Sequence, residues 1–248
     1  MRAMVLAAGL GTRLRPLTDD RPKALVEVSG RTLLEITLTR LRSFGIHDVI
    51  VNVHHFADKV ASFLKEHENF GMNIEVSHED VLLDTGGGLK KAGWFFLKQP
   101  DQAEPFILHN VDVVSTIDLQ RMVQFHKDNQ ALATLAVQRR DSSRYLLFDE
   151  QLQLCGRKIG REAKPEIVRI TPNSEARAFS GIHVISPRLL KLMKEQGIFS
   201  IVNSYLRLAG SGEKIVAFRA DEYYWRDLGK PADLQQATRD LELGVFSA

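Results

Sequence analysis

The chain has 248 residues, 44% of them hydrophobic and 26% charged, so it can bury a full core and fits one large globular domain. Its 33 basic and 31 acidic residues are interspersed and give a formal charge of +2, which excludes the long basic run typical of nucleic-acid or anionic-membrane binding. A single cysteine, Cys155, excludes an internal disulfide, and no apolar run approaches the roughly 20 residues that span a bilayer. The apolar run at the start is too short for a signal peptide, so we expect a cytoplasmic protein.

The first half of the chain alternates between apolar runs of strand length and helical periodicities. Residues 3–8 form a continuous apolar run that ends at Gly9, as expected for a strand buried on both faces of a parallel sheet. We expect strands at 3–8, 49–53, 74–76, 105–108 and 131–137, and helices at 34–41, 56–64, 89–97 and 118–127. This alternation predicts an α/β fold.

From about residue 139 the pattern changes to short strands separated by polar turns. The stretch 156–166 lacks any periodicity and predicts an exposed loop. No repeat or linker divides the chain, which favours a single domain. The expected elements are strands at 145–148, 152–154, 167–170, 178–185 and 215–218, and helices at 187–195, 201–209 and 231–243.

A glycine turn rich in cations follows the first expected strand. Backbone N–H groups beside glycines can approach phosphate oxygens, and Arg13, Arg15 and Lys23 can neutralise the phosphate charge. The segment is not a Walker A loop, because no G-K-[ST] follows. It is not a dinucleotide fingerprint either, because Leu14 stands where a third glycine is needed. It therefore indicates a polyphosphate site, with an ordinary solvated loop as the alternative.

The whole run LAAGLGTRLRPLTDDRPKALVEVSGRTLLE resembles the N-terminal signature of the sugar-1-phosphate nucleotidyltransferases, with Glu27 replacing the usual proline. The resemblance implies a Rossmann-like three-layer α/β/α sandwich with a mostly parallel sheet. It implies one domain over 1–248, with a nucleotide-binding half at 1–138 and a sugar-binding half at 139–248. The substrates implied are an NTP and a sugar 1-phosphate, with Mg²⁺ as cofactor, and neither a nucleic acid nor a membrane as partner. Nothing in the sequence indicates an oligomeric state.

The same resemblance implies roles for individual residues. The Arg13 position binds the departing phosphates, and the Lys23 position touches the reacting phosphates, so both are expected to be catalytic together with Asp112. The expected nucleotide-binding residues are Leu6, Ala7, Ala8, Gly9, Gly11, Thr12, Arg13, Lys23, Thr85, Gly86 and Gly87.

Three successive glycines, Gly86 to Gly88, open an expected helix. They cost backbone entropy, so we expect something to approach this N-terminus closely, with a flexible turn as the alternative. The segment resembles the family element that lies against the base and the sugar. Its triple-glycine form is most similar to the N-acetylmuramate-1-phosphate uridylyltransferases, which favours UTP.

Two aspartates are the expected metal ligands. Asp112 follows a strand, where a carboxylate can hold Mg²⁺ against phosphates, although a cap or turn is the commoner role for such an Asp. The segment HNVD resembles the family's N-G-D metal motif, with Val111 in place of glycine. The segment YWRDLG resembles a W-x-D-x-G element whose Asp, here Asp227, supplies the second carboxylate. In the alternative interpretation Trp225 is a core residue and Asp227 a helix cap.

The acceptor side is less specific in sequence. Residues 179–182 resemble the family strand beside the sugar, so Ser180 and Gly181, with Asn110, are expected to contact the acceptor. Lys164 invites comparison with a lysine that binds the sugar phosphate in related enzymes, but its position in an expected loop is the stronger interpretation. Arg144 is another candidate for the sugar phosphate, but a solvated surface arginine is the stronger interpretation. Alternative functions are a guanylyltransferase acting on mannose or heptose 1-phosphate, a cytidylyltransferase acting on phosphocholine, and a non-catalytic sensor on the same fold.

Overall fold

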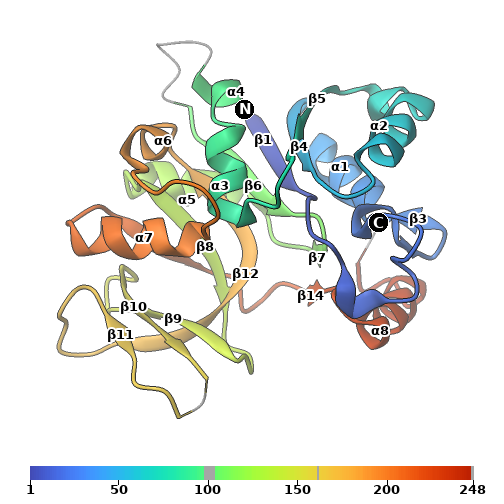
Figure 1. The fold of residues 1–248 in the computed structure, drawn as a ribbon. Coiled ribbons are helices and arrows are strands. Elements are labelled where there is room, and N and C mark those ends of the chain that lie inside the picture. The colour runs from blue at the N-terminus through green and yellow to red at the C-terminus, as the bar shows by residue number, and fades with distance from the viewer. Residues whose placement is uncertain (98–103, 161, 247–248) are drawn as a thin grey trace.

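The computed structural model describes residues 1–97, 104–160 and 162–246 (Figure 1). Its centre is one mixed sheet. The strands are β1 (Arg2–Leu6), β4 (Asp48–Val53), β5 (Asn73–His78), β6 (Phe106–Asn110), β8 (Ala133–Gln138), β9 (Arg144–Phe148), β10 (Leu154–Ile159), β11 (Glu166–Ile167), β12 (Glu175–Ile185) and β13 (Ile215–Arg219). The spatial order is β11-β10-β9-β12-β6-β1-β4-β5, with β8 between β12 and β13.

The main part of the sheet is parallel apart from one strand. The strands β5, β4, β1 and β6 pair in parallel, as do β8 and β13. The long strand β12 runs in the opposite direction between β6 and β8. Its N-terminal part also pairs with β9, from which β10 and β11 extend as an antiparallel lobe. The expected α/β fold with a mostly parallel sheet is therefore confirmed.

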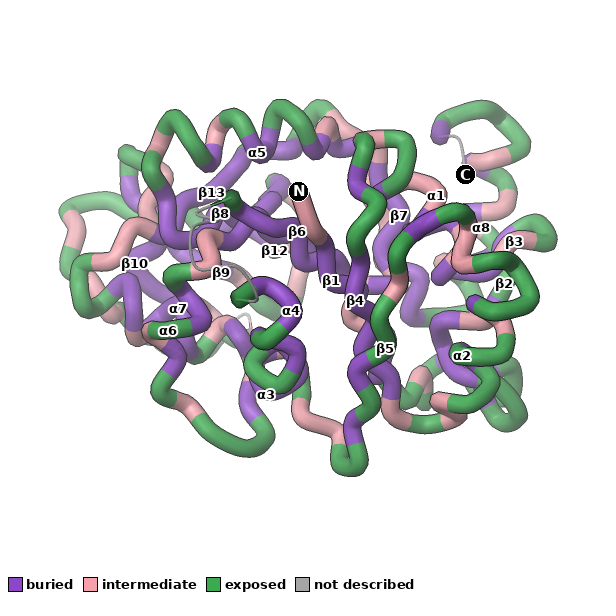
Figure 2. Tube along the Cα trace, turned by 90° about the horizontal axis from the view of Figure 1, so that it is seen from above, coloured by how far each residue is buried: buried purple, intermediate pink, exposed green. Residues whose placement is uncertain are grey.

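Helices cover both faces of the sheet and make three layers. They are α1 (Leu33–Ser43), α2 (Ala57–Glu66), α3 (Asp84–Lys91), α4 (Trp94–Leu97), α5 (Leu119–Asp128), α6 (Arg188–Leu192), α7 (Ile201–Gly210) and α8 (Pro231–Glu242). Alternate strand residues enter two separate cores: Ala3 and Val5 pack with α1, α2, α5 and α8, whereas Met4 packs with α3, α4, α6 and α7. Figure 2 shows α5 and α3 on opposite sides of the buried strands β1 and β6.

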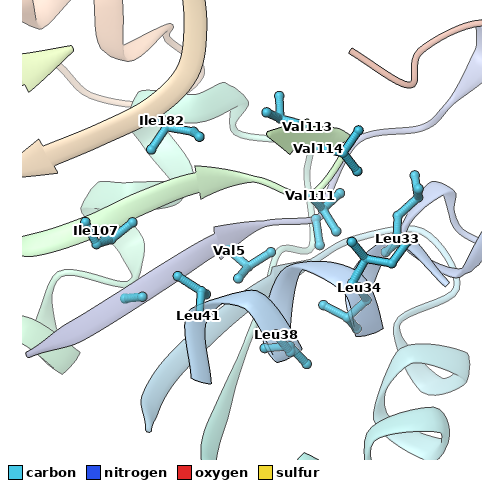
Figure 3. Close-up of a cluster of buried hydrophobic side chains, with 14 of the residues drawn as sticks. Val5, Leu33, Leu34, Leu38, Leu41, Ile107, Val111, Val113, Val114 and Ile182 are labelled. Atoms are coloured by element: carbon cyan, nitrogen blue, oxygen red, sulfur yellow. The ribbon is translucent and has the colours of Figure 1, made fainter. Parts of the chain in front are cut away.

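The first core explains why α1 forms where its periodicity predicts. Thr32 caps the helix by accepting a hydrogen bond from the Glu35 amide at 3.1 Å. The side chains of Leu34, Leu38 and Leu41 are fully buried on one face. Figure 3 shows them gathered with core residues of the sheet, including Val5 and Val111.

Four sequence expectations are corrected. The helix expected at 89–97 begins at Asp84, so the three glycines lie inside α3, and Trp94–Leu97 forms a separate turn, α4. Part of the loop expected at 156–166 is strand, because residues 156–159 belong to β10 and pair with β9. Pairing with another segment of the chain is not visible in the periodicity of the sequence. Residue 161 of that stretch lies outside the described residues. The strand expected at 167–170 is limited to Glu166–Ile167, and the helix expected at 187–195 to Arg188–Leu192.

Short elements complete the fold. A hairpin of β2 (Glu27–Val28) and β3 (Arg31–Thr32) precedes α1, and β7 (Val113–Ser115) pairs with β14 (Trp225–Asp227). The 3₁₀ turns are η1 (Thr12–Leu14), η2 (Lys23–Leu25) and η3 (Glu68–Gly71). Within the described ranges, no helix combines the length and apolarity that crossing a membrane requires.

Candidate active site

Two adjoining cavities open at the carboxyl ends of the parallel strands, where α/β folds bind ligands. The first has a volume of about 370 Å³, and the second, towards β9 and β10, about 510 Å³. They share Asp84, Thr85 and Asn110. The first, which we call the nucleotide cavity, is lined by Leu6, Ala8, Gly9, Lys23, Asn52, Glu79, Leu82, Val111, Asp112 and Ile198 besides the shared residues. The second, the acceptor cavity, is lined by residues from β7, β9, β10, β12, β14 and the start of α7.

Asp112 and Asp227 meet between these cavities. Asp112 lies between β6 and β7, and β7 pairs antiparallel with β14 so that Val113 stands opposite Asp227. The amide of Leu228 donates a hydrogen bond to the carbonyl of Asp112 at 2.7 Å. Asp112 lines the nucleotide cavity and Asp227 lines the acceptor cavity. The pairing of two three-residue strands thus places side by side two carboxylates that are far apart in sequence.

Two cations accompany the carboxylates. The ammonium group of Lys23, at the start of η2, forms an ion pair with Oδ2 of Asp112, and both side chains are largely buried. Arg13, in η1, lies beside Asp227: a Cβ added to Gly229 would come within 2.5 Å of both Nη2 of Arg13 and Oδ1 of Asp227. The expected cationic face of the glycine loop therefore points at the two carboxylates.

The local electrostatics favour an added cation. Burial raises the pKa of Asp227, and the neighbouring negative charge of Asp112 raises it further, against the opposing effects of Lys23 and Arg13. The ionised form of Asp227 is therefore less favoured than that of a solvated aspartate, and an added cation would offset this effect.

The donor set fits Mg²⁺, which commonly takes one or two protein carboxylates and completes its shell with water and substrate phosphates. Asp112 and Asp227 are two such carboxylates, and they border the space in which phosphates would lie. No group of three or more His, Cys, Asp and Glu side chains able to hold a metal occurs in the part of the chain that the structure describes. The residues present therefore suit a metal shared with substrate rather than a closed protein cage.

The glycine loop is shaped around Lys23. Gly11 has a left-handed backbone with φ of 66°, which favours glycine, and an added Cβ would lie 3.0 Å from Cβ of Lys23. The hydroxyl of Thr18 donates to the Gly11 carbonyl at 2.9 Å and closes the loop. Of the residues expected to bind nucleotide here, Leu6, Ala8 and Gly9 line the cavity. Lys23 lines it as well, whereas Ala7, Gly11, Thr12 and Arg13 do not.

The three glycines of α3 are approached closely, but by the protein itself. A Cβ added to Gly87 would lie 2.5 Å from the carbonyl oxygen of Gly197, and one added to Gly88 would lie 2.6 Å from Oε1 of Glu79. The amides of Gly86 and Gly87 donate to the carbonyl of Phe199. Thr85 lines both cavities, whereas Gly86 and Gly87 are buried and line neither. Direct contact of these two glycines with nucleotide stays a prediction.

The acceptor cavity brings together the residues expected from 179–182 and the end of β6. Ser180, Gly181 and Asn110 all line it. The indole Nε1 of Trp225 donates to the Ser180 carbonyl at 2.7 Å, which fixes the floor of the cavity. The hydroxyl of Ser180 and Oδ1 of Asn110 are buried and have no hydrogen-bond partner among the described residues.

A family model described as nucleotidyl transferase matches residues 2–243. The chain belongs to this family. Among curated relatives, it is 28% identical to a UTP–glucose-1-phosphate uridylyltransferase of Synechocystis over 97% of this chain, and 30% identical to a mannose-1-phosphate guanyltransferase of Candida albicans over 96%. It covers 63% and 64% of those proteins, so it spans somewhat less than two thirds of their length. An N-acetylmuramate alpha-1-phosphate uridylyltransferase of Caulobacter vibrioides is 55% identical over 93 residues, 36% of this chain and 38% of that protein.

Solved structures agree on the nucleotidyl transferase fold. A putative glucose-1-phosphate thymidylyltransferase from Bacillus anthracis superposes with a TM-score of 0.80 at 18% identity, covering 100% of this chain and 98% of that one. HddC from Yersinia pseudotuberculosis, crystallised with GMP-PN, superposes with a TM-score of 0.75 at 22% identity, covering 97% and 99%. At these identities the likeness establishes the fold.

In this nucleotidyl transferase chain, Val111 replaces the glycine of the metal motif without distorting the backbone. Its side chain is 4% exposed and packs into the core beside α1, and its φ is not among the positive values. Its amide donates to the Leu6 carbonyl at 3.1 Å, which ties Asp112 to the end of β1. The valine therefore anchors the segment that carries the carboxylate.

Besides Asp84, sequence reasoning missed two polar residues of the nucleotide cavity, Asn52 and Glu79. Asn52, at the end of β4, accepts a hydrogen bond from the Ala7 amide at 2.8 Å and donates one to buried Glu79 at 2.6 Å. Their position after parallel strands β4 and β5 is the signal that could have found them. The ring Nδ1 of His54 forms a hydrogen bond with the Glu79 carbonyl beside this network.

The cations that line the acceptor cavity come from positions that the sequence analysis did not favour. Lys164 is exposed and does not line the cavity, whereas Arg144 does line it. Two arginines that the sequence analysis did not single out, Arg140 and Arg157, line it as well. Cys155 is buried, and burial raises the pKa of its thiol, in keeping with an inert residue.

Proposed function

We propose that this chain is a sugar-1-phosphate nucleotidyltransferase that joins a nucleoside monophosphate from an NTP to a sugar 1-phosphate and releases pyrophosphate. The observation that carries the proposal is the position of Asp112 and Asp227 between two adjoining cavities, with Lys23 and Arg13 beside them. One cavity suits a nucleotide and the other a sugar phosphate, and the carboxylates lie where the two substrates would react.

The reaction needs positioning and charge stabilisation more than acid–base chemistry. The acceptor phosphate is anionic at neutral pH, so its oxygen attacks the α-phosphorus without a general base. A bond forms between that oxygen and the α-phosphorus as the bond to the bridging oxygen of the β-phosphate breaks, and pyrophosphate leaves with those electrons. Lys23 and Arg13 stabilise the negative charge that collects on the reacting and departing phosphates.

Asp112 and Asp227 would hold the Mg²⁺ ion. When bound, the ion neutralises phosphate charge and orients the reacting groups. In this structure the ammonium group of Lys23 forms an ion pair with a carboxylate oxygen of Asp112. Metal and triphosphate binding would therefore redirect its ammonium group towards phosphate.

Uridylyl transfer to N-acetylmuramate 1-phosphate or a similar acceptor is the favoured reaction. The triple glycine of α3 and the 55% identity over 93 residues to the Caulobacter uridylyltransferase support it. Guanylyl transfer is the alternative, supported by the 30% identity over 96% of the chain to a mannose-1-phosphate guanyltransferase. Either reaction would place the chain in nucleotide-sugar biosynthesis, the first of them in the supply of cell-wall precursors.

The test is pyrophosphate release in a panel that crosses four NTPs with the 1-phosphates of N-acetylmuramate, N-acetylglucosamine, glucose, mannose and heptose, in the presence of Mg²⁺. We expect one NTP and one acceptor to exceed the others. Release with phosphocholine and CTP alone would reject the sugar acceptor. Nucleotide binding without turnover across the panel would reject catalysis and support the sensor.

A further inference from the structure

The acceptor cavity contains one half-buried cation without a carboxylate partner, Arg140. It lies two residues beyond the end of β8 and lines the acceptor cavity, and it is not among the residues that line the nucleotide cavity. Its guanidinium carbon lies 3.6 Å from the ring centroid of Trp225, two residues from Asp227. The negative charge of Asp227 also acts on it and opposes the lowering of the Arg140 pKa by burial. Arg140 therefore lies at the end of the cavity where the two substrates would react.

The hydrogen bonds of Arg140 are incomplete. A guanidinium has five N–H donors in a fixed plane. Nη2 donates to the Phe179 carbonyl at 2.7 Å, while Nε is buried and has no partner among the described residues. Arg140 forms no ion pair with any residue in the described ranges, in contrast to its exposed neighbour Arg139, which pairs with Glu175 at 2.8 Å. A cation removed from water in this way is stabilised by an anion that enters the cavity.

The stacking on Trp225 prepares this side chain for an anion. It fixes the guanidinium plane at low entropic cost, and Nη1 donates no hydrogen bond within the described ranges, so this part of the planar guanidinium can meet the oxygens of a phosphate. Trp225 is itself held by its hydrogen bond to the Ser180 carbonyl. The guanidinium of Arg140, the indole of Trp225 and Asp227 therefore line the acceptor cavity together.

The other cations near this cavity are less suited to the reacting end. Arg157 is already engaged, because its Nε pairs with Glu166 at 2.6 Å and its Nη1 donates to Asn203 at 2.9 Å. Arg144 is exposed and stands opposite Ile159 in the β9–β10 lobe. Lys164, the position suggested by resemblance, is exposed and outside the cavity lining.

From this arrangement we infer that Arg140 binds the phosphate of the sugar 1-phosphate acceptor and holds it beside Asp227 for attack on the α-phosphorus. The inference rests on the proposed function and adds to it the residue that recognises the acceptor phosphate. In this arrangement Lys23 lies on the nucleotide side, paired with Asp112, and Arg140 lies on the acceptor side, where it feels the charge of Asp227 without forming an ion pair with it.

The test compares Arg140→Gln and Arg140→Lys with the wild type. Glutamine keeps a polar side chain but removes the charge, whereas lysine keeps the charge. Two other cations provide matched controls, Arg139→Ala and Lys164→Ala. Calorimetric titration with each sugar 1-phosphate of the panel, in the presence of α,β-methylene UTP or GTP and Mg²⁺, reports acceptor binding without turnover. Pyrophosphate release reports the KM of each substrate.

We expect Arg140→Gln to weaken acceptor binding and raise the acceptor KM by about 10- to 100-fold, the loss typical of one charge-assisted hydrogen bond to phosphate. The Kd of the nucleotide analogue should stay within about twofold, and lysine should restore part of the acceptor affinity. A purely structural role would instead disturb both substrates equally, with no rescue by lysine.

Unchanged acceptor affinity in Arg140→Gln, with an active wild type, would overturn this assignment and leave the proposed function intact. The same holds if Lys164→Ala, rather than Arg140→Gln, loses acceptor affinity. A wild type that binds no sugar 1-phosphate of the panel would overturn both proposals.

Discussion

The ammonium group of Lys23 donates a hydrogen bond to Oδ2 of Asp112, although 89 positions separate the two residues in the chain. The contact joins the glycine loop to the segment after β6. Both side chains are mostly out of water, with 10% and 18% of their surfaces exposed. Each charge therefore depends on the other until phosphates and a metal ion enter.

We expect Lys23→Ala and Asp112→Asn each to lower the rate of pyrophosphate release at least 100-fold, of the order seen when one group that stabilises transition-state charge is removed. The fold should persist, because both residues border open cavities rather than the core. Circular dichroism is the control. Undiminished pyrophosphate release by both variants would contradict the assigned roles.

Two arginines of one loop should behave differently. Arg13 lies beside Asp227 and Gly229, whereas Arg15 is 69% exposed and pairs only with Asp19 in its own loop. Arg13→Ala should lower kcat/KM for the NTP by about 10- to 100-fold, as expected on loss of a charge-assisted phosphate contact. Arg15→Ala should stay within about twofold of the wild type. Equal losses in the two variants would mean that only the net charge of the loop matters.

The triple glycine should be required for stability. Gly87→Ala would bring a methyl group to 2.5 Å from the Gly197 carbonyl, a backbone atom that cannot rotate away. We expect a loss of about 1–3 kcal/mol, typical of overpacking, measured by urea denaturation. Gly9→Ala is the matched control, since nothing lies within 4 Å of its added Cβ. A Gly87→Ala variant as stable as Gly9→Ala would show that α3 can move away from the segment it packs against.

Because three histidines are buried, we expect the free energy of unfolding to fall in mild acid. Burial lowers the pKa of His109 and His126 to about 4 and that of His183 to about 3, from 6.5 in an unfolded chain. The unfolded state therefore binds more protons in this window. The stabilisation is complete above pH 6.5 and is lost as pH falls towards 4, by roughly 1.4 kcal/mol per pH unit for each histidine.

Urea denaturation between pH 7 and pH 4 measures this slope. His126→Gln retains an amide for its hydrogen-bond partners Thr134 and Ser186 and should reduce the slope by one histidine. His47→Gln, at an exposed position, should leave it unchanged. A slope that is the same in all three proteins would mean that other groups cause the acid sensitivity.

Metal removal should abolish turnover without unfolding the chain. The two carboxylates are held by the pairing of β7 with β14, so their positions do not depend on a bound ion. We expect EDTA to stop pyrophosphate release and added Mg²⁺ to restore it, with the melting temperature of the free protein unchanged. Asp227→Asn should raise the Mg²⁺ concentration for half-maximal rate by about tenfold or more, because one charged ligand is lost. Full activity in EDTA would argue against the metal role of both aspartates.

The sequence by itself determined the α/β alternation, because buried strands and helices with one apolar face leave a pattern of apolar residues within a single segment. The apolar runs that form β1 and β4 and the leucine spacing of α1 can be recognised without knowing what these elements pack against. It also marked the glycine loop and both aspartates, because their spacing within short segments matches a family signature. It placed the strand that became β10 at 152–154 and missed its extension to residue 159, because that part depends on hydrogen bonds to β9.

Only the tertiary structure decided which distant segments meet. The pairing of β7 with β14 puts Asp227 beside Asp112, the contact of Gly87 with Gly197 explains the glycine cluster, and the stacking on Trp225 brings Arg140 into the acceptor cavity. None of these contacts leaves a periodic trace, because each joins residues at a separation set by the path of the whole chain. The physical reason is that the pattern of apolar residues within one helix or strand shows which of its faces is buried. A functional site depends in addition on which distant segments pack against that helix or strand.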